Sequence, residues 1–384
     1  MDWSCKGNSY FNCFVHPCNW WNLYHIIWCN HELYIVFKIF QFASLFIGRI
    51  GVPFFLMITG YLLLDRVYDD EKVRKFWTKN CIGLIIVTVL WSTIYAVSIL
   101  YVSLFSVNVN TMEAGNLFFS HMWYMPMIIG MYLSLPFVAS ALSHYKPKTI
   151  EQATIVFSLL AFLLPFISLL FDMEGIRNIN IQFCLGFSGG IYGIYIILGW
   201  LVKKGQFKKY SSNKFRLLAI VSFLICVLFQ YYAYIRGYPF LLWYEFPFIL
   251  TGSLALFELC SRRKKVRGFK GVQFLSKYSF AVFLIHNLFR IPLLPLVVLL
   301  PFTEPVKAII LWILLIYSAM RQLLLFTESL NTVNLFCIWD NRDNTYYLII
   351  FIFKNFKKKL FLINTIFINN IFINNDSNKT IFNN

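Results

Sequence analysis

The run Arg49-Ile-Gly-Val-Pro-Phe-Phe-Leu-Met-Ile-Thr-Gly-Tyr-Leu-Leu-Leu64 decides the fold class of this chain. Together with the apolar residues just before it, the run is long enough to cross the roughly 30 Å hydrocarbon core of a bilayer as one helix. An arginine inside such a helix costs about 3 kcal/mol on an insertion scale. Because of this cost, we expect Arg49 to face a polar cavity or a ligand, and it marks a candidate site.

The composition of the whole chain is that of a polytopic membrane protein. Of its 384 residues, 59% are hydrophobic and only 13% are charged, against about 25% charged residues in soluble domains. Apolar runs of helix length recur along the chain, so we predict an all-α, polytopic membrane helix bundle of about ten transmembrane helices. The expected spans are 9–28, 40–64, 80–104, 121–142, 153–171, 184–202, 216–235, 242–259, 278–300 and 306–325.

Basic side chains gather in alternate loops between these spans. The loops at 65–79, 144–152, 203–215 and 261–277 are rich in lysine and arginine, whereas the other loops hold little beyond Arg177, Arg236 and Lys307. The positive-inside rule therefore predicts a multi-pass protein of the cell membrane with the basic loops and both termini in the cytoplasm. The net charge of +17 reflects this topology and the tail, and we expect no nucleic-acid partner because no basic soluble domain accompanies it.

The two ends of the chain differ in composition from its middle. We predict a membrane-embedded domain over 1–325 and a low-complexity cytoplasmic tail over 326–384, in which Phe-Ile-Asn-Asn occurs at 367–370 and again at 372–375. Tracts of Asn, Ile, Phe and Lys are what A/T-rich codons encode when they are read out of frame. The tail, and with it the first thirty or so residues, is therefore either an out-of-frame product or a natural but unusual segment.

Three motifs place polar groups in or beside the expected spans. The first is Arg49-x-x-Val52-Pro53-x-Phe55, continued by Gly60-Tyr61-Leu62, and the second is His121-x-Trp123-Tyr124 with Tyr132-Leu133 and Pro136 downstream. The third is Ser279-x-x-x-x-x-Ile285-His286, with Arg290 one helical turn further on.

Taken in this order, the motifs resemble those of the integral-membrane acyltransferase family 3, and most closely the branch that O-acetylates cell-surface glycans. The resemblance covers roughly residues 35–315, with Thr59 in place of the usual serine and Ala281-Val282-Phe283 in place of Gly-Ile-Tyr. It implies an O-acyltransferase that moves an acetyl or similar group from acetyl-CoA to a hydroxyl of a cell-envelope polysaccharide or lipid-linked sugar.

The resemblance also implies roles for five residues. His16 is the expected general base, because Lys6-Gly7 precedes it and Trp20 follows it as in the family, and histidine titrates near neutral pH. His286 and His121 are expected to line the path between donor and acceptor, His286 in the inner half of the membrane and His121 near the outer face. Arg49 and Arg290 are expected to bind the phosphates of coenzyme A. No metal is expected, since the early cysteines and histidines match no Cys-x2-Cys spacing.

Other interpretations of the same residues stay open. Arg49 could be a structural partner of Glu245 or of backbone carbonyls, His121 part of an interfacial belt with Trp123, and His286 a packing residue of the bundle. At the level of the whole chain, the alternatives are a polytopic transporter or flippase of envelope precursors and an inactive, frameshifted acyltransferase. Internal symmetry typical of transporters is not visible in the sequence.

Overall fold

The computed structural model of this protein describes residues 31–105, 121–176, 190–263, 280, 283–288, 310, 313–314, 317 and 321. The chain divides into two units, Met1–Ala319 and Met320–Asn384, and every helix named below belongs to the first. The regular structure of the described residues is helical throughout, and no strand occurs among them. The predicted all-α class is therefore confirmed for this part of the chain.

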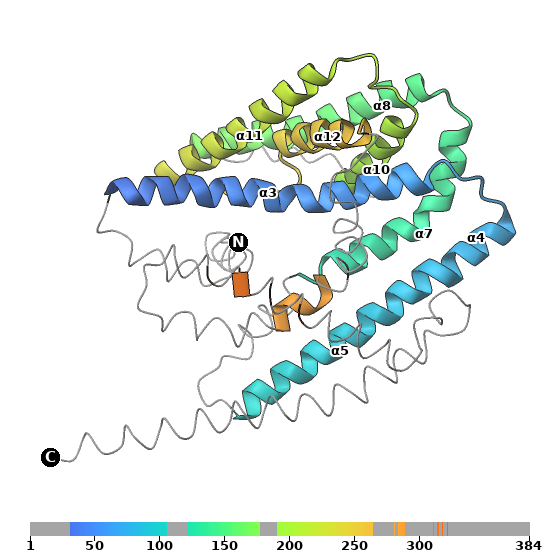
Figure 1. Cartoon of the computed structure of the whole chain (residues 1–384), viewed down its shortest axis with the longest axis horizontal. Helices are drawn as coiled ribbons and strands as arrows, with labels where there is room; N and C mark the ends of the chain where they lie inside the picture. The colour runs from blue at the N-terminus through green and yellow to red at the C-terminus, as the bar shows by residue number, and fades with distance from the viewer. Residues whose placement is uncertain are drawn as a thin grey trace. The chain divides into compact units, whose positions relative to one another are not determined.

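The helices follow one another along the chain, and short connections at 64–69 and 144–146 join neighbouring helices (Figure 1). Two π-helical turns, η2 and η3, join α4 to α5 and α8 to α9, so that 70–105 and 147–173 are each continuous. The elements in chain order are α3 (His31–Leu63), α4 (Asp70–Phe76), η2 (Trp77–Cys81), α5 (Ile82–Phe105), α7 (Tyr124–Ser143), α8 (Pro147–Ser158), η3 (Leu159–Leu163), α9 (Leu164–Met173), α10 (Gly190–Lys203), α11 (Ser212–Ile235) and α12 (Pro247–Ser261).

Five of these helical segments are long and apolar enough to cross a membrane. They are Lys38–Leu63, Asp70–Leu100, Tyr124–Ser143, Pro147–Met173 and Ser212–Ile235. They correspond to the predicted spans 40–64, 80–104, 121–142, 153–171 and 216–235. Two further apolar helices, α10 and α12, are shorter, and the predicted spans 9–28, 278–300 and 306–325 lie wholly or mostly outside the described residues. A total of about ten spans stays a prediction.

Local sequence explains where α4 begins. Asp69 precedes the helix in an extended conformation, and its carboxylate accepts a hydrogen bond of 2.8 Å from the backbone N–H of Lys72. Two acidic residues occupy the first turn and two basic residues the last, which is the arrangement that the helix dipole favours. The basic loop after α3 is thus a short structured connection into the next span.

The closest packing in the bundle is between α3 and α10. A Cβ atom placed on Gly60 would overlap the carbonyl group of Ile196, and one placed on Gly199 would overlap that of Met57. Small residues at both crossing points let the two backbones touch, as is typical of helix pairs in membranes. Met57 is fully buried beside this contact. The run 49–64 is therefore one half of a tightly packed helix pair.

The predicted span 242–259 needs a correction. Residues 238–246 are not helical, and α12 begins only at Pro247 and ends at Ser261. Its 15 residues correspond to a length of about 22 Å at 1.5 Å per residue, which is short of a full crossing. Pro239 and Pro247 have no backbone N–H to donate, so each interrupts helical pairing over the residues that precede it.

Candidate functional site

Two histidines that are 165 positions apart in the sequence meet in the structure. His121 lies in the turn that precedes α7, and His286 lies in the helical segment 283–288. Their ring centroids are 5.0 Å apart, with the rings at 72° to each other. The ring centroid of Tyr95, from α5, lies 5.2 Å from that of His121, and the ring centroid of Phe283 lies 5.3 Å from it. Three elements therefore enclose one imidazole pair.

Hydrogen bonds fix the orientation of this pair. His286 Nδ1 lies 2.7 Å from the carbonyl oxygen of Phe283, and a carbonyl oxygen can only accept. Nδ1 of His286 therefore carries its proton, and the basic lone pair of the neutral ring is on Nε2. On the other ring, His121 Nδ1 lies 2.7 Å from the side-chain Nδ2 of Asn287. The hydroxyl of Tyr95 donates to the Leu284 carbonyl at 2.5 Å.

This contact corrects the expected depths of the two histidines. The sequence placed His286 in the inner half of the membrane and His121 near the outer face, whereas their rings touch. The prediction was wrong because depth was counted from span ends, which hydropathy locates only to about four residues, or some 6 Å of helix. His121 also contacts bundle residues on several sides instead of joining a lipid-facing belt.

Arg49 is held by a non-helical segment that lies 193 positions further along the chain. Its Nε donates to the carbonyl oxygen of Leu242 at 2.9 Å, and its guanidinium lies 4.0 Å over the ring of Trp243 and 5.5 Å from that of Tyr244. Of the alternatives left open by the sequence, the carbonyl partner is the one observed. None of the ion pairs between described residues joins Arg49 to Glu245.

Other polar side chains bind the backbone of the same segment. Gln230, from α11, donates to the Phe240 carbonyl at 2.7 Å and accepts from the Leu242 N–H at 2.9 Å. The hydroxyl of Tyr195, from α10, donates to the Tyr244 carbonyl at 2.7 Å. Backbone groups away from water need such partners, because each unsatisfied group in hydrocarbon costs several kcal/mol. Sequence reasoning missed Gln230, although an amide within an apolar span is a signal in itself.

An aromatic wall connects Arg49 with the histidine pair. Trp243, beneath Arg49, lies 5.8 Å from Trp123, which lies 6.1 Å from Tyr124. Tyr124 in turn lies 5.6 Å from Phe283, the neighbour of both histidines. A continuous row of aromatic side chains therefore links Arg49 with the histidine pair.

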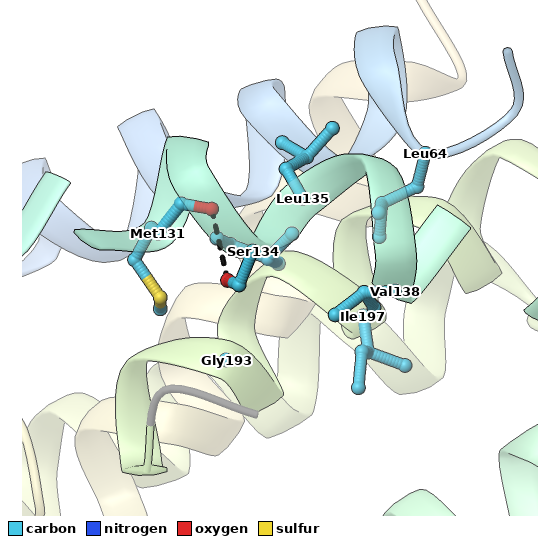
Figure 2. Close-up of a pocket in the computed structure, with 8 residues that line it drawn as sticks. Leu64, Met131, Ser134, Leu135, Val138, Gly193 and Ile197 are labelled. Atoms are coloured by element: carbon cyan, nitrogen blue, oxygen red, sulfur yellow. Dashed lines mark hydrogen bonds between the residues drawn. The ribbon is translucent and has the colours of Figure 1, made fainter. Parts of the chain in front are cut away.

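A small cavity lies elsewhere in the bundle, between α3, α7 and α10 (Figure 2). Its only hydroxyl, on Ser134, turns back to the Met131 carbonyl of the same helix at 3.1 Å. None of the candidate site residues that the structure describes borders it, and its apolar walls offer nothing for acyl transfer. The lining residues are Leu64, Met131, Ser134, Leu135, Val138, Gly193, Ile196 and Ile197.

Two predicted site residues, His16 and Arg290, lie outside the described residues. Their roles stay predictions. The residues that sequence reasoning did not single out at this site are Asn287, Tyr95 and Gln230. Asn287 directly follows His286, so its position beside a candidate histidine was a usable signal.

Bilayer-length apolar helices with cationic and imidazole side chains gathered between them define a multi-pass membrane protein. The family model of acyltransferase family 3, described as an acyltransferase domain, matches residues 12–321, and the chain belongs to this family. No curated protein and no solved structure matches the chain. The protein is thus a membrane acyltransferase, and the resemblance inferred from the motifs is confirmed.

Proposed function

We propose that this protein is an O-acyltransferase that moves an acetyl group from acetyl-CoA to a hydroxyl of a cell-envelope polysaccharide or lipid-linked sugar. Family membership supports acyl transfer. The observation that carries the proposal is the contact between His121 and His286 at 5.0 Å. Attack by a sugar hydroxyl on a thioester needs a base that works near neutral pH, and imidazole meets that need.

The chemistry requires one base and no covalent enzyme intermediate. Nε2 of His286 takes the proton of the acceptor hydroxyl while the hydroxyl oxygen bonds to the thioester carbonyl carbon. The carbon–sulfur bond then breaks, and the departing thiolate of coenzyme A takes the proton from the His286 imidazolium. One ester and one thiol result from one alcohol and one thioester. The reaction calls for no metal.

Arg49 is the proposed ligand for the phosphates of the donor. Its Nε is engaged by the Leu242 carbonyl, so the terminal nitrogens of the fork are the ones to bind an anion. The ring of Trp243 under the guanidinium holds its plane. Arg290, which follows His286 by four residues, is the proposed second ligand.

His16 stays a second candidate for the base, on the strength of its family-like sequence context. The two assignments make different predictions, because removal of a general base costs about 10²–10⁴-fold in rate, whereas loss of a residue that only lines the path costs less. His286 is the base that the described geometry favours, since the Phe283 carbonyl leaves Nε2 as its basic nitrogen.

The test is transfer of labelled acetyl from acetyl-CoA to envelope glycan in membrane vesicles, with quantified expression of each variant. His286→Ala should lose about 10²–10⁴-fold. His144→Ala is the matched control, because this exposed histidine ends the helix that follows His121, and its hydrogen bonds to described residues are local, to the Ser140 carbonyl and the Ser143 hydroxyl. Wild-type rates in His286→Ala, with a collapse in His16→Ala, would transfer the role of base to His16.

The same assay separates the alternatives for the whole chain. A transporter or flippase would move envelope precursors without placing label in them, so absence of transfer by the wild-type chain would oppose the proposal. If transfer appears only after the ends of the reading frame are repaired, the middle of the chain is that of an enzyme and its ends are out of frame.

We also propose that both termini are cytoplasmic, in the cell membrane, on the basis of the basic loops alone. Single cysteines at positions 110 and 207, in loops of opposite charge character, test this with an impermeant thiol reagent. Only the cysteine at 110 should react from outside intact cells, and reaction of the one at 207 alone would reverse the orientation.

A further inference from the structure

Asn287 makes a contact that decides how the second histidine of the pair can act. Its side chain is buried, with 2% of its surface exposed, and its Nδ2 lies 2.7 Å from Nδ1 of His121. An amide nitrogen carries two hydrogens and has no acceptor, so it can only donate. Nδ1 of His121 is therefore the acceptor, and in the neutral ring the proton is on Nε2.

The helical segment 283–288 places the ring proton of one histidine on Nδ1 and that of the other on Nε2. His286 carries its proton on Nδ1, where it donates to the Phe283 carbonyl, and is basic at Nε2. His121 is occupied as an acceptor at Nδ1 and presents an N–H at Nε2. The contact with Asn287 requires a neutral His121 ring, which avoids two imidazolium charges with centroids 5.0 Å apart. One ring of the pair can accept a proton while the other donates a hydrogen bond.

Acyl transfer has a use for such a donor. When the hydroxyl oxygen bonds to the thioester carbon, the carbonyl oxygen becomes an oxyanion, and a fixed N–H aimed at it stabilises the transition state. We propose that His121 supplies this N–H through Nε2, and that Asn287 is the positioning residue that keeps the proton there. This inference rests on the proposed function, because it assigns roles within that reaction.

Tyr95 stabilises the arrangement from α5. Its hydroxyl donates to the Leu284 carbonyl at 2.5 Å, and its ring packs perpendicular to that of His121 with the centroids 5.2 Å apart. The helix turn that carries Asn287 is thereby tied to α5, while His121 is tied to Asn287. The titratable groups that face His121 from the described elements packed on it are Tyr95 from α5 and His286 from the 283–288 helix.

Asn287→Asp tests the proposal with almost no change of shape. A carboxylate can only accept, so Nδ1 of His121 must take the proton, and the neutral ring loses the N–H at Nε2. We expect kcat to fall by about 10²–10³-fold, the usual cost of one oxyanion donor, with KM nearly unchanged. At lower pH His121 becomes an imidazolium with protons on both nitrogens, so the donor returns.

The pH dependence gives a readout that a purely structural defect does not produce. The ratio of the Asn287→Asp rate to the wild-type rate should rise as the pH falls, because protonation of His286 affects both proteins and cancels in the ratio. Asn80→Asp is the control, since Asn80 is a half-buried membrane-helix amide whose hydrogen bond within the described part of the chain is to the Phe76 carbonyl of the same continuous helix. Its ratio to wild type should not vary with pH in this way.

Variants of His121 itself keep the test decisive if Asn287→Asp fails to fold. The amide nitrogen of a glutamine reaches about as far as Nε2 of histidine, so His121→Gln should retain more transfer than His121→Phe. Equal loss in both, or wild-type activity in Asn287→Asp, would overturn the donor role. If His286→Ala still loses transfer in those cases, the proposed function stands; if it does not, the proposed function fails as well.

Discussion

Replacing Gly199 with alanine should loosen the contact between α10 and α3. The added Cβ would lie well inside 3.0 Å of three backbone atoms of Met57, its carbonyl oxygen, its carbonyl carbon and its Cα. A side chain can rotate away from such an overlap, but the backbone of a membrane helix cannot. The two helices must therefore move apart along the whole crossing, including the Gly60 contact with Ile196 one turn away.

The magnitude follows from two opposing terms. Alanine is favoured over glycine inside a helix by about 1 kcal/mol. Overpacking of a close contact costs typically about 1–3 kcal/mol, and occasionally more, and we expect the upper end because backbone atoms meet the new methyl group. Gly199→Ala should therefore lower the free energy of unfolding by about 2 kcal/mol.

Gly130→Ala is the matched control, because this glycine is inside α7 and a Cβ atom there would meet nothing within 4 Å. It should gain the helix-propensity term alone, so the two variants should differ by about 3 kcal/mol. Unfolding in mixed micelles by titration with sodium dodecyl sulfate, followed by tryptophan fluorescence, measures the difference. Equal midpoints and slopes for the two variants would refute the close approach of α3 and α10.

Three further predictions follow from polar contacts. Arg49→Lys keeps a positive charge but loses both the planar guanidinium and the Nε that donates to the Leu242 carbonyl. Acyl transfer should therefore fall at least tenfold with expression maintained. Unchanged transfer in the vesicle assay would remove Arg49 from the site. Hydrogen bonding to Lys204, followed by the smaller Coulombic effects of the nearby lysines, holds the pKa of Asp65 below its usual value against the opposing effect of burial. Because the pKa of Asp65 is lower in the folded state, the stabilisation that its carboxylate contributes is complete above the unfolded-state pKa of about 4. This stabilisation is lost as the pH falls through the folded-state pKa. The difference in unfolding free energy between wild type and Asp65→Asn should therefore be constant from pH 5 to 7 and vanish at the acidic end of a pH series. Arg262→Met leaves the Glu258 carboxylate, whose side chain is 2% exposed, without the guanidinium that lies 2.8 Å away, so unfolding in mixed micelles should become easier by about 3 kcal/mol, and Glu258→Gln in the same chain should recover part of the loss.

The sequence predicts the long helices well because their signal is local. The span expected at 216–235 is Ser212–Ile235 in the structure, and the one expected at 121–142 is Tyr124–Ser143. Apolar composition over some twenty residues is sufficient to locate such helices. The same signal fails at 242–246, where Glu245 is the one charged residue among apolar and aromatic ones but the backbone is not helical. What decides that conformation is a set of partners far away in the chain, such as Arg49, 193 positions from Leu242.

Motifs predict which residues matter better than they predict how those residues meet. The sequence shows where His121 and His286 lie along their own segments. It does not show how far the two segments are shifted relative to each other along their axes. That shift depends on which side chains interlock, and here Asn287 and Tyr95 fix it through bonds to His121 and Leu284. The residues that orient a site are therefore harder to find from sequence than those that perform the chemistry.

The non-helical approach to α12 has a consequence for how the protein assembles in the bilayer. A 15-residue helix that follows a non-helical segment inserts poorly by itself. Each backbone N–H or C=O group of that segment left without a hydrogen-bond partner in hydrocarbon costs several kcal/mol. The hydrogen-bond partners of the backbone at Leu242 and Tyr244, which precede α12, are side chains of α3, α10 and α11. Insertion of α12 should accordingly await those three helices, which makes it a late step of biogenesis, and a chain arrested before that step should expose 238–246 to proteases that do not cut the finished protein.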